Sequence, residues 1–103
     1  MGEPIRIRAK SRDGTTEILV LMPHPMESGF RKNDRGRPIP AHYITDAEVA
    51  IAGRTVLRMK MSPAVAQDPL ISFRVRGESP GERISVTWID TAGDRRTDES
   101  VIG

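Results

Sequence analysis

The chain has 103 residues, with 16 basic and 14 acidic side chains, a net charge of +2 and no cysteine. This length fits one domain with one modest core, so we expect a single domain over residues 1–103. The missing cysteine excludes disulfides, thiolate metal sites and a cysteine nucleophile. The N-terminal residues carry no apolar run, so we expect neither a signal peptide nor a membrane span.

Short segments of alternating polarity predict a chain of strands with almost no helix. The expected strands are Ile5 to Ala9, Glu17 to Met22, Tyr43 to Ile51, Thr55 to Met61, Leu70 to Arg76, Arg83 to Asp90 and Arg95 to Ile102. The connections are too short for crossovers, so the strands must pair mostly antiparallel. Seven such strands predict an all-β fold, an immunoglobulin-like antiparallel β-sandwich. A small barrel is the alternative.

The alternation also predicts which side chains face the core. In the strand that ends at Asp90, we expect Trp88 to be the largest inward residue, beside Ile84 and Val86. The strand from Tyr43 is expected to place alternate residues on one side. These are Tyr43, Thr45, Ala47, Val49 and Ile51.

Basic side chains gather in two places. One group shares a face of the first strand and consists of Arg6, Arg8, Lys10 and Arg12. The other group crowds the segment between the second and third strands and consists of Arg31, Lys32, Arg35 and Arg37. Such patches attract anions, nucleic acid or an acidic protein. For the first group we favour a solvated strand face that protects an edge from aggregation.

The segment from residue 23 to residue 43 holds both histidines, the only tyrosine and four of the eight prolines. It is too long for an ordinary turn, and connections of this kind are usually functional or disordered. Its apolar residues favour an ordered loop that contacts a partner. The predicted partner interface is His24, Met26, Phe30, Arg31, Lys32, Ile39, His42 and Tyr43. Alternatively, Met26 and Phe30 fold back over the end of the sandwich.

Catalytic and metal signatures are weak. The two histidines have only Glu27 and Asp46 as nearby carboxylates in the sequence, whereas a stable zinc site needs three or four ligands. The serines lack a nucleophile elbow, and no glycine-rich loop leads into a helix. We therefore expect no catalytic, metal or cofactor site and no enzymatic activity.

Several segments together resemble the SoxZ family, the Z subunit of the thiosulfate-oxidation carrier complex of sulfur-oxidising bacteria. They are Met22 to Lys32, Ile39 to Ile44, Val86 to Asp90 and Gly93 to Glu99. The similarity runs from Ile5 to Ile102 without a large insertion. Ser28 and Phe30 depart mildly from the residues expected in the family.

The resemblance implies the same sandwich fold and a non-catalytic role. In that family the subunit pairs with SoxY, which carries sulfur intermediates on a cysteine of its C-terminal arm. The Z subunit then stabilises the carrier and offers docking surface to the other Sox enzymes. It also implies export to the periplasm together with a signal-bearing partner. A homodimer of the isolated chain remains open, and a small basic β-domain that binds nucleic acid is the alternative function.

Overall fold

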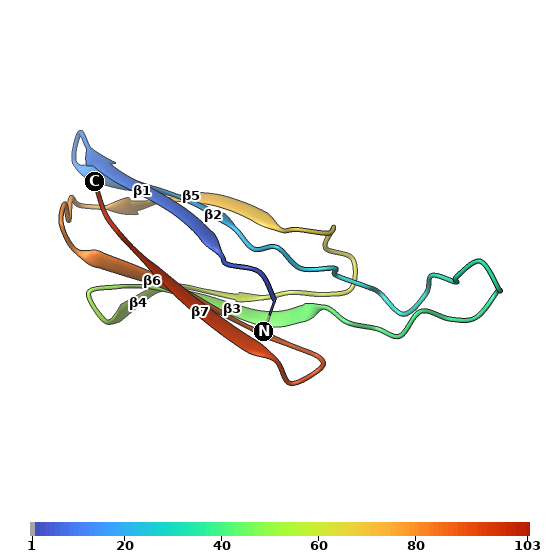
Figure 1. The fold of residues 1–103 in the computed structure, drawn as a ribbon. Coiled ribbons are helices and arrows are strands. Elements are labelled where there is room, and N and C mark those ends of the chain that lie inside the picture. The colour runs from blue at the N-terminus through green and yellow to red at the C-terminus, as the bar shows by residue number, and fades with distance from the viewer. Residues whose placement is uncertain (1) are drawn as a thin grey trace.

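The computed structural model describes residues 2–103, which form seven strands (Figure 1). The strands are β1 (Arg6–Arg12), β2 (Thr15–Leu21), β3 (Ile44–Ile51), β4 (Arg54–Lys60), β5 (Leu70–Arg76), β6 (Arg83–Asp90) and β7 (Arg95–Val101). The predicted strands are confirmed, with ends displaced by a few residues at most. Residues 2–103 contain no helix long and apolar enough to span a bilayer.

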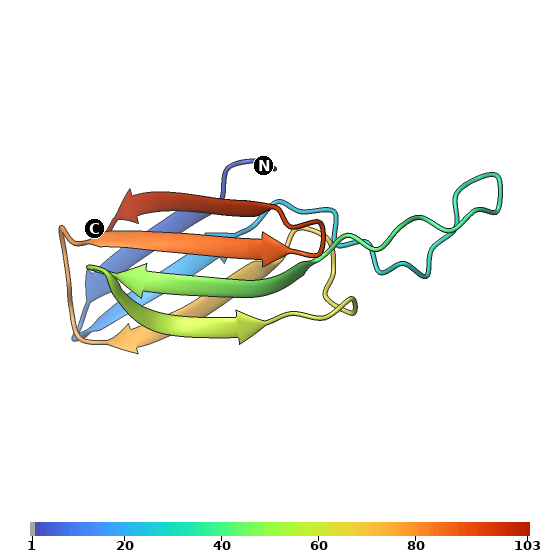
Figure 2. The same ribbon diagram turned by 90° about the horizontal axis from the view of Figure 1, so that it is seen from below.

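The strands build two antiparallel sheets that lie face to face (Figure 2). One sheet has the order β1-β2-β5 and the other has the order β4-β3-β6-β7. The immunoglobulin-like sandwich is therefore confirmed, and the barrel does not form because the two sheets stay separate.

The core lies between the sheets because strand alternation sends every second side chain inward. Ile18 and Val20 of β2 face Ile84, Val86 and Trp88 of β6 across this space, and each of the five is at most 2% exposed. Burial of an aliphatic or aromatic side chain of this size contributes about 1.5–3 kcal/mol. The prediction that Trp88 is the largest core residue of its strand is confirmed by its 1% exposure.

The start of β3 departs from the predicted alternation. A register shift between Ile44 and Asp46 inserts one extra residue opposite β6. Because an extra residue reverses the phase of the alternation, Ile44 is buried and Thr45 is not. The expectation for Thr45 was wrong for this reason.

The two sheets are also tied together at the β1 and β7 edges. The Ile5 amide donates to Asp98 Oδ2 at 2.8 Å. The Gly103 amide donates to the Ala9 carbonyl at 2.9 Å, and the Ser11 amide donates to the Gly103 carbonyl at 2.9 Å. These bonds satisfy backbone groups that an open sheet edge would leave unpaired.

The connection between β2 and β3 extends well beyond the sandwich, as both ribbon views show (Figures 1 and 2). It accounts for the elongated shape of the molecule, which measures 53 × 21 × 19 Å. The predicted partner-binding residues all lie on this connection or at its ends.

Candidate functional site

Residues 27–42, called the arm below, form an irregular hairpin. At its base, Glu27 and His42 exchange backbone hydrogen bonds of 2.7 and 2.8 Å. Farther out, the Ile39 amide donates to the Arg31 carbonyl at 2.8 Å. The arm is therefore held by its own backbone, although it projects away from the core.

Asn33 organises the tip of the arm. Its side-chain oxygen accepts the amides of Arg35 and Arg37 at 2.9 and 3.0 Å. Its carbonyl accepts the Gly36 amide at 2.9 Å. Gly36 has a φ of +75°, a left-handed conformation that glycine adopts without a steric penalty. The tip is a tight turn, and the four basic side chains at or near it are exposed. They are Arg31, Lys32, Arg35 and Arg37.

The middle of the arm presents a large apolar side chain to solvent. Phe30 is 86% exposed, and its amide is fixed by Ser28 Oγ at 3.0 Å. Arg31 lies beside it and forms two bonds to the Glu27 carboxylate, at 2.7 and 3.0 Å. An aromatic ring held this far from the core gains nothing from burial in the isolated chain.

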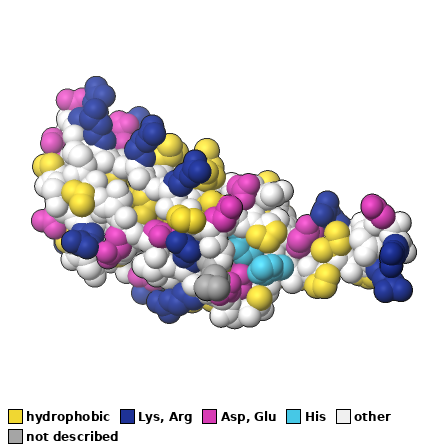
Figure 3. Space-filling view, in the orientation of Figure 1, with side chains coloured by type: hydrophobic (Ala, Val, Ile, Leu, Met, Phe, Trp, Pro, Cys, Tyr) yellow, Lys and Arg dark blue, Asp and Glu magenta, His cyan; other side chains and the backbone are white. Residues whose placement is uncertain are grey.

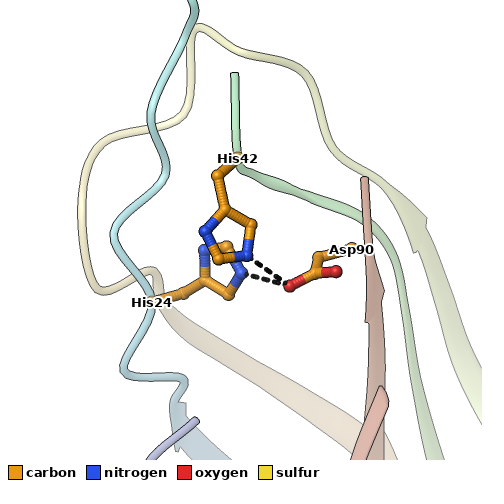
Figure 4. A group of neighbouring side chains, drawn as sticks. All are labelled: His24, His42 and Asp90. Atoms are coloured by element: carbon orange, nitrogen blue, oxygen red, sulfur yellow. Dashed lines mark hydrogen bonds and ion pairs between the residues drawn. The ribbon is translucent and has the colours of Figure 1, made fainter. Parts of the chain in front are cut away.

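Three polar side chains meet where the arm joins the sandwich (Figure 4). Asp90 lies at the end of β6, and its Oδ2 accepts His24 Nε2 at 2.9 Å and His42 Nε2 at 2.8 Å. The side chains of His24 and Asp90 are 2% and 1% exposed, whereas that of His42 is 40% exposed. We call this trio the clamp because it joins the segment just before the arm, through His24, and the last residue of the arm, His42, to β6.

Asp90 is fully occupied by donors. Its Oδ1 accepts the amides of Ala92 and Asp94 at 3.0 and 2.9 Å, which fixes the turn between β6 and β7. Burial, the largest single influence, raises the pKa of Asp90. The hydrogen bonds from His24, His42 and the Ala92 amide together outweigh burial, so the pKa of Asp90 lies below its ordinary value of 3.8.

His24 is fixed from every side. Its Nδ1 accepts the Met26 amide at 3.1 Å, so the proton of the neutral ring resides on Nε2 and points at Asp90. Its amide donates to Asp68 Oδ1 at 2.9 Å, and its carbonyl accepts the Asp68 amide at 3.0 Å. Its ring lies edge-on to Trp88, with centroids 5.0 Å apart. His24 therefore anchors the arm to the core.

The clamp has the composition of a partial metal site. One ligand atom from each of His24, His42 and Asp90 lies within 4.8 Å of the others. A metal ion on His24 Nε2 would displace the proton there, while the Met26 amide already occupies Nδ1. The ring would then have to be a doubly deprotonated imidazolate, which is costly. The geometry favours a hydrogen-bonded clamp over a metal centre.

The sequence matches the family described as "Sulphur oxidation protein SoxZ" over residues 5–101. The chain belongs to the SoxZ family. A search of curated proteins finds no match. The segments that resemble SoxZ in the sequence now have a common location, since three of them supply one clamp residue each. His24 comes from the first segment, His42 from the second and Asp90 from the third.

The predicted interface residues of this SoxZ-family chain fall into three groups. The exposed group lies on the arm and comprises Phe30, Arg31 and Lys32. The half-buried group comprises Ile39, His42 and Tyr43. The buried group comprises His24 and Met26, which support the arm from within the sandwich. The alternative of a self-packed loop therefore describes Met26 but does not describe Phe30.

Asp90 is the residue that sequence reasoning missed. Glu27 and Asp46 were considered as carboxylates near the histidines, but Glu27 pairs with Arg31 and Asp46 pairs with Lys60 at 2.5 Å. The available signal was the alternation of β6. It places residue 90 on the same inward face as Trp88, and an inward carboxylate must find donors.

The clamp predicts a dependence of stability on pH. The pKa of Asp90 is lower in the folded than in the unfolded chain, so its ionised carboxylate stabilises the fold. This stabilisation is fully present at pH values above the ordinary aspartate pKa. The contribution is lost as pH falls through the folded-state pKa. We expect the difference in unfolding free energy between wild type and Asp90→Asn to shrink as the protein is acidified. Urea unfolding from about pH 7 to about pH 3 measures this difference. A constant difference across this range would contradict an ionised Asp90.

Proposed function

We propose that this chain is the non-catalytic partner of SoxY in a periplasmic sulfur-carrier complex, and that the arm is its main SoxY contact. Membership of the SoxZ family supports a role in sulfur oxidation. The chain has no cysteine, so a thiol-bound sulfur intermediate must be carried by another subunit. Export would then depend on the signal-bearing partner.

The observation that carries the proposal is the exposed Phe30 on a fixed hairpin. Backbone bonds at Glu27 and Ile39 and the clamp at its base hold the arm in place before any partner arrives. Less conformational entropy is therefore lost on binding. Aromatic and arginine side chains are enriched at the centres of interfaces, and both occur here as Phe30 and Arg31.

The arm also carries an electrostatic signal. Lys32, Arg35 and Arg37 are exposed near its tip, and among residues 2–103 they form no ion pair within 4 Å. An acidic surface on SoxY would be attracted by these charges, and this attraction would weaken with salt. The exposed Phe30 then supplies the apolar part of the contact.

The proposal predicts that Phe30→Ala weakens binding to SoxY. We expect a loss of more than about 2 kcal/mol, or about thirtyfold in Kd, because a central aromatic of an interface acts as a hot spot. Isothermal titration with purified SoxY measures this loss. The unfolding midpoint should stay unchanged, since the ring contacts little of the sandwich.

Val101→Ala is the matched control for Phe30→Ala. Val101 is an apolar side chain that is 59% exposed, and it pairs with Arg83 at the end of β6 opposite to Asp90 and the arm. Its replacement should leave SoxY affinity at the wild-type value. Equal affinity of the Phe30→Ala variant and the wild type would reject the arm as the SoxY contact.

A further inference from the structure

The outer face of the β1-β2-β5 sheet carries side chains that the arm does not explain. The strand register places them in rows across the sheet, and we call them the basic face. The rows are Arg6, Leu21 and Leu70; Arg8, Leu19 and Ser72; Lys10, Glu17 and Arg74; and Arg12, Thr15 and Arg76. Apolar residues therefore lie in the two rows nearest the arm, with Arg6 and Arg8 beside them on β1 and most of the other charged residues in the two rows beyond.

The apolar rows form an exposed patch. Leu70 is 64% exposed and Leu19 is 38% exposed, and with Leu21 they line a shallow hollow beside Arg6 and Arg8. Exposed leucines at one end of a charged strand face gain nothing in a free monomer. The patch combines an apolar area with adjoining basic side chains, as interfaces do.

The charge on this face is strongly unbalanced. Six basic side chains surround one carboxylate, so the face carries +5 although the whole chain carries +2. Among the described residues, only Arg12 of the six forms an ion pair, with Asp13 at 3.7 Å. In the orientation of Figure 1, basic side chains follow the edge of the molecule over β1, with apolar side chains beside them (Figure 3).

The opposite sheet shows that this imbalance is not general. Its outer face pairs Arg58 with Glu48 at 3.5 Å and Lys60 with Asp46 at 2.5 Å. At its other edge, Arg83 pairs with Glu99 at 3.1 Å. Charges that only keep a strand face soluble would be satisfied by such mixed pairs. On the basic face, by contrast, five of the six basic side chains form no ion pair with any described residue.

The chemistry of the face selects among partners. A second copy in the same orientation would bring six basic side chains against six others, which opposes self-association. No aromatic side chain lies in the rows, so stacking of nucleic-acid bases has no platform there. An acidic protein surface with an adjoining apolar area matches both the charge and the leucines.

We infer that the basic face is a docking surface for a folded protein whose contact area has acidic side chains next to an apolar area. This inference rests on the proposed role beside SoxY and assigns the face to the Sox enzymes that act on the carrier. The arm would hold SoxY, while the basic face would receive these enzymes in turn. The first basic group of the sequence then has a role beyond protection of a strand edge.

The test uses the complex of this chain with SoxY as substrate for each purified Sox enzyme of the same organism. Two variants address the face, Arg6→Glu with Arg8→Glu and, separately, Leu70→Ser. Each has a matched control on the other sheet. Arg58→Glu with Arg95→Glu changes the net charge equally, and Val101→Ser removes an aliphatic side chain that is 59% exposed.

We expect both face variants to raise KM of at least one enzyme by about tenfold, with kcat unchanged. The wild-type KM should rise with salt, and this dependence should be reduced in the arginine variant. SoxY affinity should remain at its wild-type value, which separates this result from a failure of the arm proposal.

Three results would overturn the inference. The first is an unchanged KM for every enzyme relative to the controls. The second is loss of SoxY affinity in the face variants, which would make the face part of the SoxY contact. The third is binding of the wild-type complex, abolished by the face variants, to vesicles of anionic phospholipid or to duplex DNA in place of the enzymes.

Discussion

Replacement of Asp90 by alanine is expected to lower the free energy of unfolding by about 3–5 kcal/mol. The carboxylate accepts four hydrogen bonds, two from histidine rings and two from backbone amides. Alanine leaves all four donors without an acceptor, and the His24 ring is buried where water cannot replace it. Urea unfolding with circular dichroism measures the loss, which is large for a domain of this size.

The same substitution should loosen the arm before it unfolds the sandwich. His24, just before the arm, and His42, its last residue, both bond to Asp90 of β6. Without Asp90, the backbone pair of Glu27 and His42 loses this support. We expect faster hydrogen exchange at these two amides than at β2 or β6 amides. Asp46→Ala is the control, because Asp46 is half-exposed and its partner Lys60 lies on the surface. Equal stability of the Asp90→Ala variant and the wild type would contradict the clamp.

The Trp88→Ala substitution is expected to cost a similar amount, about 3–5 kcal/mol, because it empties the largest fully buried position between the sheets. The indole packs edge-on against His24, and Gly2 lies against its outer ring atoms. Loss of the ring therefore weakens the core and the wall of the clamp together. Chemical unfolding of the variant measures the first effect, and exchange of the His42 amide measures the second.

Trp88→Phe separates the apolar contribution from the polar atom of the indole. Among residues 2–103, Trp88 Nε1 has no hydrogen-bond partner, so phenylalanine removes an unsatisfied donor together with part of the ring. Trp88→Phe should lower the free energy of unfolding much less than Trp88→Ala does. Because the chain has one tryptophan, its native fluorescence reports this site alone. Emission typical of an exposed indole would contradict the assigned register of β6.

The clamp also explains the strained turn at the start of the arm. Met26 has a φ of +49°, a left-handed conformation that costs a non-glycine residue about 1–3 kcal/mol. In this conformation its amide bonds His24 Nδ1, and its sulfur accepts the Ile44 amide at 3.3 Å. Both contacts are buried. The strain is thus offset by bonds that place the arm at a defined angle to the core.

The fold class could be predicted from the sequence because its signals are local, and the family was indicated by the segments that resemble SoxZ. Alternation with period two identifies each strand, and the short connections require antiparallel pairing. The inward position of Trp88 and the shared face of Arg6 and Arg8 follow from the same periodicity. The limit of this reasoning appears at Thr45, where a bulge reverses the phase without any signal in the residues beside it.

The clamp and the basic face required the tertiary structure because each joins residues that are distant in the chain. His24 and Asp90 are 66 positions apart, and no periodicity relates a loop histidine to the end of a strand. Leu70 joins Leu19 and Leu21 only through the pairing of β2 with β5. The different exposure of Met26 and Phe30 also depends on the tertiary structure, since both are apolar residues of one loop and the sequence does not distinguish them. The left-handed turn at Met26 directs one inward, and the hairpin that follows carries the other into solvent.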